Sequence, residues 1–247
     1  RSSDLAEMIS EIKEETGKEI AYVIVSEAGA SVYSASELAT KEYPDLDVTV
    51  RGAISIGRRL QDPLAELVKI DPKAIGVGQY QHDVTPKKLE ESLAGVVEDS
   101  VNTVGVDLNI ATPSLLTHIS GINAAIAKNI VDYREEAGHF TSRKELLKVK
   151  RLGQKAYEQC AGFLRVAESK EPLDNTSVHP ESYDAAKKLI GVLGYDNEAL
   201  KNNKLGDIDE KAECYGISKL SKELEIGEMT LKDIIKELKK PDRKSVV

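Results

Sequence analysis

The chain has 247 residues, with 34 Lys and Arg against 42 Asp and Glu, so its formal net charge is −8. It contains no run of about 18 apolar residues, which excludes a membrane-spanning helix, and its two Cys fit a reducing cytoplasm better than a disulfide framework. Taken whole, an acidic chain also argues against nucleic acid as a partner.

The first part of the chain, residues 1–84, predicts alternating helices and strands. Apolar residues recur at helical spacing over 5–12, and the continuous apolar run over 20–25 is typical of a buried strand. Residues 75–77 predict one more short strand. Because these strands are too few for a complete sheet, we expect a partial α/β domain here.

The pattern changes near residue 85, where Thr85-Pro86 opens a long predicted helix. From there to the end almost only helices are predicted, and Pro172 with a polar run over 174–177 marks a second boundary. We therefore expect three regions: a partial α/β region over 1–84, an all-α region over 85–168 and a helical region over 169–247.

The charges are unevenly distributed along the chain. Residues 1–111 carry 11 basic and 20 acidic side chains, residues 112–168 carry 9 and 6, and residues 169–247 carry 14 and 16. An isolated basic run is usually a solvated helical face, but a local excess inside an acidic chain also fits contact with nucleic acid. Residues 141–155 hold six bases against one acid, and the bases are Arg143, Lys144, Lys148, Lys150, Arg151 and Lys155.

Two segments of the predicted all-α region share one plan. Residues 115–134 and 146–161 each predict a short helix, a tight turn with one central aliphatic residue, and a second helix. The turns are Gly121-Ile122-Asn123 and Arg151-Leu152-Gly153. This is the plan of the helix-hairpin-helix motif, used here twice in tandem.

The motif is suited to a nucleic-acid phosphate. A glycine permits positive φ, the aliphatic residue packs between the helices, and the unpaired amides that begin the second helix form an anion site. Such contacts go to the backbone, so binding is expected to be salt-sensitive and largely independent of sequence. The candidate nucleic-acid-binding residues are Gly121, Ile122, Asn123, Lys128, Arg151, Leu152, Gly153, Gln154 and Lys155.

Each turn departs from a glycine-hydrophobic-glycine pattern. Asn123 replaces the second glycine of the first turn, and we expect it to tolerate a left-handed backbone. Arg151 replaces the first glycine of the second turn, where strain is expected. The alternative interpretation is two helical hairpins that only pack against each other.

Two acidic residues in the partial α/β region are candidates for a metal-dependent nuclease. Glu27 follows the expected strand and Asp62-Pro63 begins a helix, and sites in open α/β sheets form at strand ends, where two carboxylates can hold Mg²⁺. The alternatives are a helix cap for Asp62 and a solvated loop carboxylate for Glu27. The four His show no metal-ligand spacing and Cys160 fits a helical core, so we predict no metal site and no cofactor.

A family resemblance runs over essentially the whole chain. The chain resembles the family of the bacterial transcription accessory protein Tex. The similar stretches are residues 27–36, 50–65, 76–83, 101–109, 143–148 and 159–165.

The resemblance implies an internal fragment of a larger protein. In Tex proteins a YqgF domain of the RNase H-like resolvase class precedes tandem helix-hairpin-helix motifs (RuvA domain 2-like), a helical segment and an OB-fold RNA-binding domain. Glu27 matches the strand-end glutamate of YqgF domains and Asp62 their last acidic residue, whereas the first-strand Asp would lie upstream of Arg1.

The same resemblance implies a cytoplasmic transcription protein that binds DNA or RNA and is not an enzyme. RNA polymerase or the ribosome would be further partners, and no membrane is involved. Two alternatives stay open: a metal-dependent, resolvase-like nuclease that uses Glu27 and Asp62, and a protein–protein scaffold module of the transcription machinery.

Overall fold

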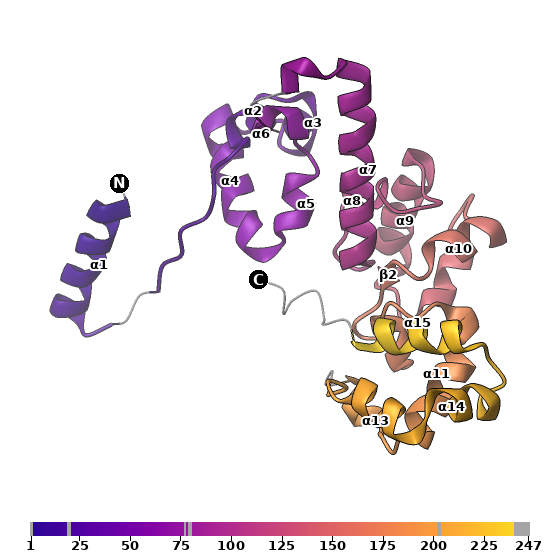
Figure 1. Cartoon of the computed structure of the whole chain (residues 1–247). Helices are drawn as coiled ribbons and strands as arrows, with labels where there is room; N and C mark the ends of the chain where they lie inside the picture. The colour runs from indigo at the N-terminus through magenta and orange to yellow at the C-terminus, as the bar shows by residue number, and fades with distance from the viewer. Residues whose placement is uncertain (1, 19–20, 77, 79–80, 202–203, 240–247) are drawn as a thin grey trace. The chain divides into compact units, whose positions relative to one another are not determined.

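A computed structural model of the chain describes residues 2–18, 21–76, 78, 81–201 and 204–239 (Figure 1). The chain divides into two compact units, residues 1–79 and residues 80–247, and each is considered by itself. Among the described residues no helix is long and apolar enough to cross a membrane.

The regular elements that the structure describes in the first unit are all helices. Tyr33, Ala39 and Ile70 form a small buried cluster in this unit. Its helices are α1 (Ser2–Thr16), α2 (Ala30–Ser34), α3 (Glu37–Glu42), α4 (Val48–Gln61), α5 (Pro63–Leu67) and α6 (Pro72–Ile75).

The two strands expected in this unit are not formed in the described residues. Residues 21–25 pair with no neighbouring strand, and Tyr22, Val23 and Ile24 expose 49%, 63% and 77% of their surface. Ile75 ends α6, while Ile20 and Val77 lie outside the described residues. The prediction was wrong because an apolar run indicates burial, whereas a strand also needs a partner for its backbone N–H and C=O groups.

Carboxylate caps set the helix boundaries in this unit. The Asp47 carboxylate accepts a hydrogen bond from the Val50 amide (2.9 Å) at the start of α4. Asp62 ends α4 and begins α5, where its carboxylate accepts from the Ala65 amide (3.0 Å) and Pro63 occupies the first helical position. The helix start predicted at Asp62-Pro63 is therefore confirmed.

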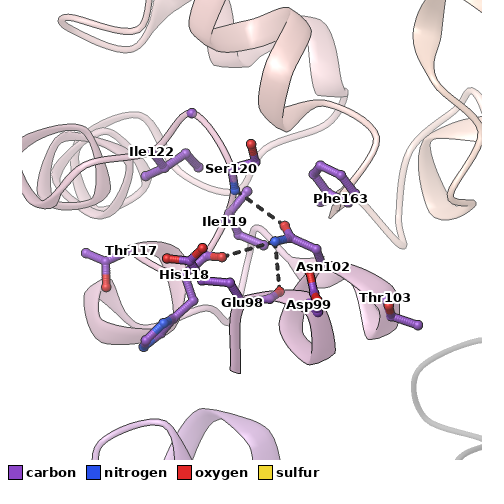
Figure 2. Close-up of a pocket in the computed structure, with 11 residues that line it drawn as sticks. Glu98, Asp99, Asn102, Thr103, Thr117, His118, Ile119, Ser120, Ile122 and Phe163 are labelled. Carbon is purple, nitrogen blue, oxygen red and sulfur yellow. Dashed lines mark hydrogen bonds between the residues drawn. The ribbon is translucent and has the colours of Figure 1, made fainter. Parts of the chain in front are cut away.

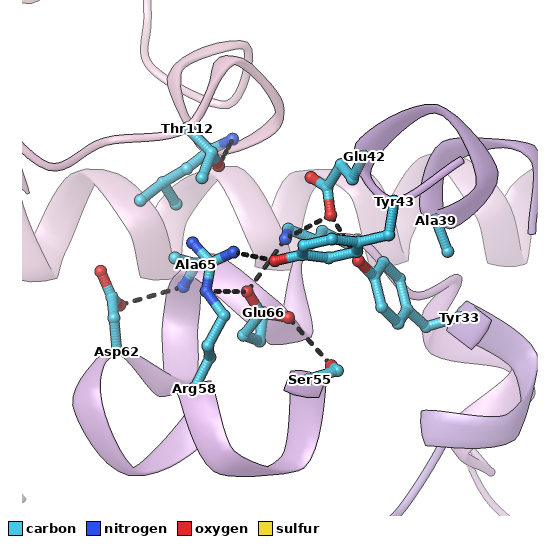
Figure 3. Close-up of polar contacts among 12 residues, drawn as sticks. Tyr33, Ala39, Glu42, Tyr43, Ser55, Arg58, Asp62, Ala65, Glu66 and Thr112 are labelled. Carbon is cyan, nitrogen blue, oxygen red and sulfur yellow. Dashed lines mark hydrogen bonds and ion pairs between the residues drawn. The ribbon is translucent and has the colours of Figure 1, made fainter. Parts of the chain in front are cut away.

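A buried polar network joins the helices of the first unit (Figure 3). The Glu66 carboxylate is buried and accepts from the Ser55 hydroxyl (2.9 Å), with Lys69 Nζ at 2.9 Å and Arg58 Nε at 3.3 Å. Lys69 also pairs with Glu42 (3.0 Å), so one ammonium links α3 to α5. The interior of this unit is therefore held together in large part by polar contacts.

The second unit begins with a 3₁₀ turn, Gln81–Asp83, and the long helix α7 (Pro86–Val104), as the Thr85-Pro86 pair predicts. A two-stranded parallel sheet brings together chain segments that lie far apart in sequence, with Val106 opposite Leu164 and Asp107 opposite Arg165. Both hairpins lie between these two strands in the sequence. The elements are β1 (Val106–Asp107), α8 (Pro113–Leu116), α9 (Ala124–Ala137), the 3₁₀ helix η2 (Arg143–Lys148), α10 (Gln154–Cys160) and β2 (Leu164–Arg165).

The remaining elements are helices (Figure 1). They share one hydrophobic core, whose buried residues run from Leu173 to Leu238. The helical structure predicted for residues 169–247 is confirmed in the described residues. The elements are η3 (Pro172–Asn175), η4 (Pro180–Ser182), α11 (Tyr183–Val192), α12 (Asn197–Lys201), α13 (Ile208–Tyr215), α14 (Ile217–Glu223) and α15 (Glu228–Lys239).

Candidate nucleic-acid interface

The two predicted hairpins have the same local backbone geometry. In the first turn the Ile122 amide donates to the Ile119 carbonyl (3.0 Å), and in the second the Leu152 amide donates to the Val149 carbonyl (3.1 Å). Ile122 and Leu152 expose only 6% and 3% of their surface. The central aliphatic residue therefore packs inward in both turns, as the sequence predicts.

Both turns place their first residue in the left-handed region. Gly121 has φ 81° and Arg151 has φ 68°. A glycine adopts this conformation without steric cost, whereas an L side chain is strained there. The strain expected at Arg151 is thus present in the second turn.

Asn123 takes a different role from the one predicted. Its backbone is extended (φ −95°, ψ 172°), and its side-chain oxygen accepts a hydrogen bond from the Ile126 amide (3.0 Å). The expectation of a left-handed Asn was wrong because this position is the N-cap of α9, where Asn is favoured for its side chain. One amide at this helix start is consequently occupied.

The second turn leaves its helix start uncapped. Gly153 is the N-cap of α10 with φ −84° and ψ 175°, and no side chain caps the helix. A Cβ added at Gly153 would meet no atom within 4 Å. Lys155 is exposed in the first turn, while the Gln154 amide group donates to Glu158 (2.9 Å). This helix start therefore offers free amides beside a positive charge.

Arg143 does not belong to the basic surface. Its side chain is fully buried, and its guanidinium donates to the carbonyls of Leu164 (2.6 Å), Val178 (2.7 Å) and Thr176. Its inclusion among the surface bases was wrong because a count of charges along the chain does not distinguish a buried guanidinium from a solvated one.

The other bases of this stretch are exposed around the second hairpin. Lys148 pairs with Glu145 (3.1 Å), which raises the pKa of Lys148. In the described part of the chain Lys128, on α9, is also exposed and has no acidic partner. The exposed bases without an acidic partner here are Lys128, Lys144, Lys150, Arg151 and Lys155.

The two hairpins are in contact with each other. A Cβ added at Gly121 would lie 2.7 Å from Gln159 Cβ and 3.2 Å from the Ala156 carbonyl oxygen, so the first turn packs closely on α10. The Asn129 side chain donates to the Lys150 carbonyl (2.6 Å) and joins α9 to the second turn. Sequence reasoning did not single out Asn129, because nothing in the local pattern distinguishes it from other polar residues on a helix.

The two candidate catalytic acids occupy different settings. Glu27 is exposed in the loop before α2, and its backbone carbonyl accepts from the Ala30 amide (2.9 Å). Asp62 caps α5, which is the alternative role that the sequence left open. Across the described residues no group of three His, Cys, Asp or Glu side chains is placed to hold a metal ion.

Cys160 lies in the core of the second unit with none of its surface exposed. Burial raises the pKa of its thiol to about 12. A thiol with such a pKa is protonated at neutral pH and is a poor nucleophile, in agreement with the structural role predicted for it.

Comparison with protein families places known domains along the chain. Residues 1–61 match the Tex protein YqgF-like domain, residues 101–165 match the helix-hairpin-helix motif, and residues 171–244 match a further HHH domain. The middle match spans both hairpins and both strands of the small sheet.

Three relatives illustrate the similarity over nearly the whole chain. Protein YdcI of Bacillus subtilis is 54% identical over 98% of this chain and 33% of its own length. The transcriptional accessory protein Tex of Neisseria gonorrhoeae is 57% identical over 90% of this chain and 28% of its own. The human S1 RNA-binding domain-containing protein 1 is 41% identical over 91% of this chain and 27% of its own length. The chain spans about a quarter to a third of the length of these relatives.

Proposed function

We propose that this chain, which belongs to the Tex family, binds the phosphate backbone of DNA or RNA through its helix-hairpin-helix turns. The observation that carries the proposal is the uncapped start of α10 beside Arg151 and Lys155. A phosphate held there would accept hydrogen bonds from backbone amides and gain from the helix dipole and both cations.

The second hairpin carries the larger share of this binding. At α9 the Asn123 side chain occupies the Ile126 amide, and the nearest base, Lys128, lies more than one helical turn beyond the N-cap. At α10 no side chain competes for the amides. The first hairpin therefore acts mainly as a packing partner with a secondary phosphate contact.

Binding of this kind does not depend on base sequence, because the amides and cations meet phosphate oxygens. Each phosphate neutralised releases counterions, so the affinity falls as salt rises. For two to four phosphate contacts, log K is expected to fall with log[salt] with a slope of roughly −2 to −4 on a duplex. The acidic charge of the first 111 residues explains why the overall charge of −8 conceals this site.

Fluorescence anisotropy with labelled single- and double-stranded DNA and RNA across a salt series tests the proposal. The double variant Arg151→Ala with Lys155→Ala should lose roughly tenfold or more in affinity and show a shallower salt slope. The matched control removes two exposed bases at the start of α7, Lys87→Ala with Lys88→Ala, and should bind normally.

A sharper test uses the open space at Gly153. Gly153→Asp supplies a carboxylate that caps α10, so it should preserve or raise stability while it abolishes phosphate binding. Gly153→Ser supplies a neutral cap and should weaken binding less. Unchanged affinity in Gly153→Asp, or affinity that is independent of salt, would contradict the proposal.

A scaffold role in the transcription machinery is the alternative without nucleic acid. In that case the basic surface would contact RNA polymerase or the ribosome, and no oligonucleotide would bind in the anisotropy series. Oligonucleotide binding that is lost in Arg151→Ala with Lys155→Ala supports the phosphate site, whereas no oligonucleotide binding in the unaltered chain supports the scaffold role.

We also propose that the chain has no nuclease activity of its own. Asp62 is engaged as a helix cap and Glu27 lies in an exposed loop, and no third acid completes a metal site in the described residues. Incubation with branched and single-stranded substrates plus Mg²⁺ or Mn²⁺ should leave them intact. Cleavage that disappears in Glu27→Gln would establish the nuclease instead.

A further inference from the structure

A pocket of about 830 Å³ lies beside the first hairpin turn (Figure 2). The end of α7 supplies one wall, the turn from Thr117 to Ile122 supplies another, and Phe163 lies at its edge. The volume is ample for one nucleobase. Nothing in the phosphate-binding role described above makes use of this pocket.

The pocket is negatively charged. Glu98 and Asp99 line it and are exposed, and their carboxylates form no hydrogen bond or ion pair within the part of the chain that the structure describes. His118 also lines it, and burial lowers the pKa of its imidazole, so it is neutral at pH 7 and does not offset the carboxylates. A phosphate is therefore repelled from this pocket, whereas a neutral group rich in hydrogen-bond donors is attracted.

The walls of the pocket are held in place by one side chain. Asn102 donates to the carbonyls of Glu98 (2.8 Å) and His118 (3.3 Å), and its oxygen accepts from the Ser120 amide (3.4 Å). These bonds tie α7 to the first turn (Figure 2). A pocket held in this way loses little further freedom when a ligand enters.

We propose that this pocket receives an unpaired base of a single strand whose backbone lies on the hairpin turns. This inference rests on the proposed function and adds the strand type and a base preference to it. The exocyclic amino groups of cytosine, adenine and guanine would donate to Glu98 and Asp99. The half-buried ring of Phe163 would provide a stacking surface for the base.

The pocket is close to the phosphate site. Gly121 lines the pocket and packs against the Ala156 carbonyl, and Ala156 directly follows Lys155 in α10. The pocket edge thus lies next to the first turn of the helix that we assign to phosphate. A base from a neighbouring nucleotide can turn into the pocket only when it is unpaired, so duplexes gain nothing from it.

The geometry yields a base preference. Cytosine carries an amino group, whereas thymine and uracil present a carbonyl oxygen at the same position, which the carboxylates repel. Oligo(dC) should therefore bind more tightly than oligo(dT), by about threefold to tenfold. A site that contacts only phosphates would bind both equally.

The experiment measures the affinities of labelled 12-nucleotide oligo(dC), 12-nucleotide oligo(dT) and a mixed duplex by anisotropy at one salt concentration. In Glu98→Ala with Asp99→Ala, the ratio of the oligo(dC) to oligo(dT) affinities should fall to about one. In Phe163→Leu, the single-strand affinity should fall about fivefold or more, while duplex affinity stays within about twofold.

A matched control separates base contacts from general electrostatics. Glu90→Ala with Glu91→Ala removes the same amount of charge from α7, about two helical turns before Glu98 and Asp99. This variant should leave the ratio of oligo(dC) to oligo(dT) affinity unchanged. A ratio of one in the unaltered protein, or a ratio unaffected by the Glu98/Asp99 variant, would overturn the inference. Loss of duplex binding in Arg151→Ala with Lys155→Ala would still support the proposed function in that case.

Discussion

Arg151 combines a strained backbone with a useful charge. Its φ of 68° lies in the left-handed region, which costs an L residue roughly 1–2 kcal/mol. Arg151→Gly should therefore raise the free energy of unfolding by about 0.5–1 kcal/mol, since the greater freedom of glycine in the unfolded chain offsets part of the gain. The same variant should bind nucleic acid more weakly because it loses a cation.

Chemical denaturation and anisotropy on the same samples check this prediction. Lys150→Gly is the matched control, because Lys150 is exposed, carries the same charge and is not among the residues with positive φ. That variant should lose both stability and affinity. Equal changes in stability for the two variants would show that the turn at Arg151 is not strained.

Cys160 makes the stability of the second unit sensitive to alkaline pH. Burial raises its pKa from 9.0 to about 12, so the folded state binds this proton more tightly than the unfolded state. The resulting contribution is complete below pH 9 and is lost as pH rises toward 12. Between pH 8 and 10.5 the free energy of unfolding should decrease by about 1–2 kcal/mol through this thiol.

Urea unfolding at pH 8 and pH 10.5 measures this effect. The decrease in unfolding free energy should be smaller in Cys160→Ala, which has no thiol to ionise, although that variant is less stable at both pH values. A thiol reagent at pH 8 should modify exposed Cys214 rapidly and Cys160 only after unfolding. Rapid modification of both thiols in the folded protein would contradict the prediction.

At the scale of elements, the contact between the hairpins depends on Gly121. Its φ is 81°, and an added Cβ would lie 2.7 Å from Gln159 Cβ. Gly121→Ala should therefore cost about 2 kcal/mol or more, because it combines backbone strain with a collision between the first turn and α10. Binding should fall as well, since α10 would shift.

Gly95→Ala provides the control for this element. Gly95 lies inside α7, and an added Cβ there would meet no atom within 4 Å. This variant should be more stable by about 0.5–1 kcal/mol, since alanine favours a helix and restricts the unfolded chain. Thermal unfolding of the two variants should thus move in opposite directions, and a common direction would refute the packing argument.

The hairpins show how far sequence reasoning reaches at this scale. The turns and their buried residues, Ile122 and Leu152, follow from spacing of a few residues and were predicted. The burial of Arg143 was not, because its partners Leu164, Thr176 and Val178 lie more than 20 residues away. The pocket beside α7 was missed for the same reason: Asn102 and His118 meet only in the folded chain.

The strand expected over 20–25 shows a different limit. Its apolar run is present, yet Val23 and Ile24 are exposed, because a ladder requires a second strand that local sequence cannot supply. By contrast, Asp62 caps a helix as predicted, because its partner, the Ala65 amide, lies only three residues away. Predictions that depend on near neighbours in the sequence were confirmed more often than those that depend on distant partners.

At the scale of the whole molecule, the two units differ in what fills their interiors. The first has a small apolar cluster of Tyr33, Ala39 and Ile70 beside buried charges. Among the latter, Arg59 donates through Nη1 to the carbonyls of Ser26 (2.7 Å) and Ala28 (2.9 Å). Its Nε and Nη2 are buried without a hydrogen-bond partner in the described structure, which costs free energy.

The second unit contains an extended apolar core from Leu173 to Leu238. Because apolar burial is the main stabilising contribution and unsatisfied polar groups oppose it, the first unit should open at lower free energy than the second. Hydrogen exchange followed by mass spectrometry should show amides of α4 opening at least about 2 kcal/mol more easily than those of α11 and α15. A low concentration of urea should increase the hydrogen exchange of the α4 amides before that of the α11 and α15 amides. Equal opening free energies and equal urea dependence in the three helices would mean that both units unfold as one cooperative structure, despite their different interiors.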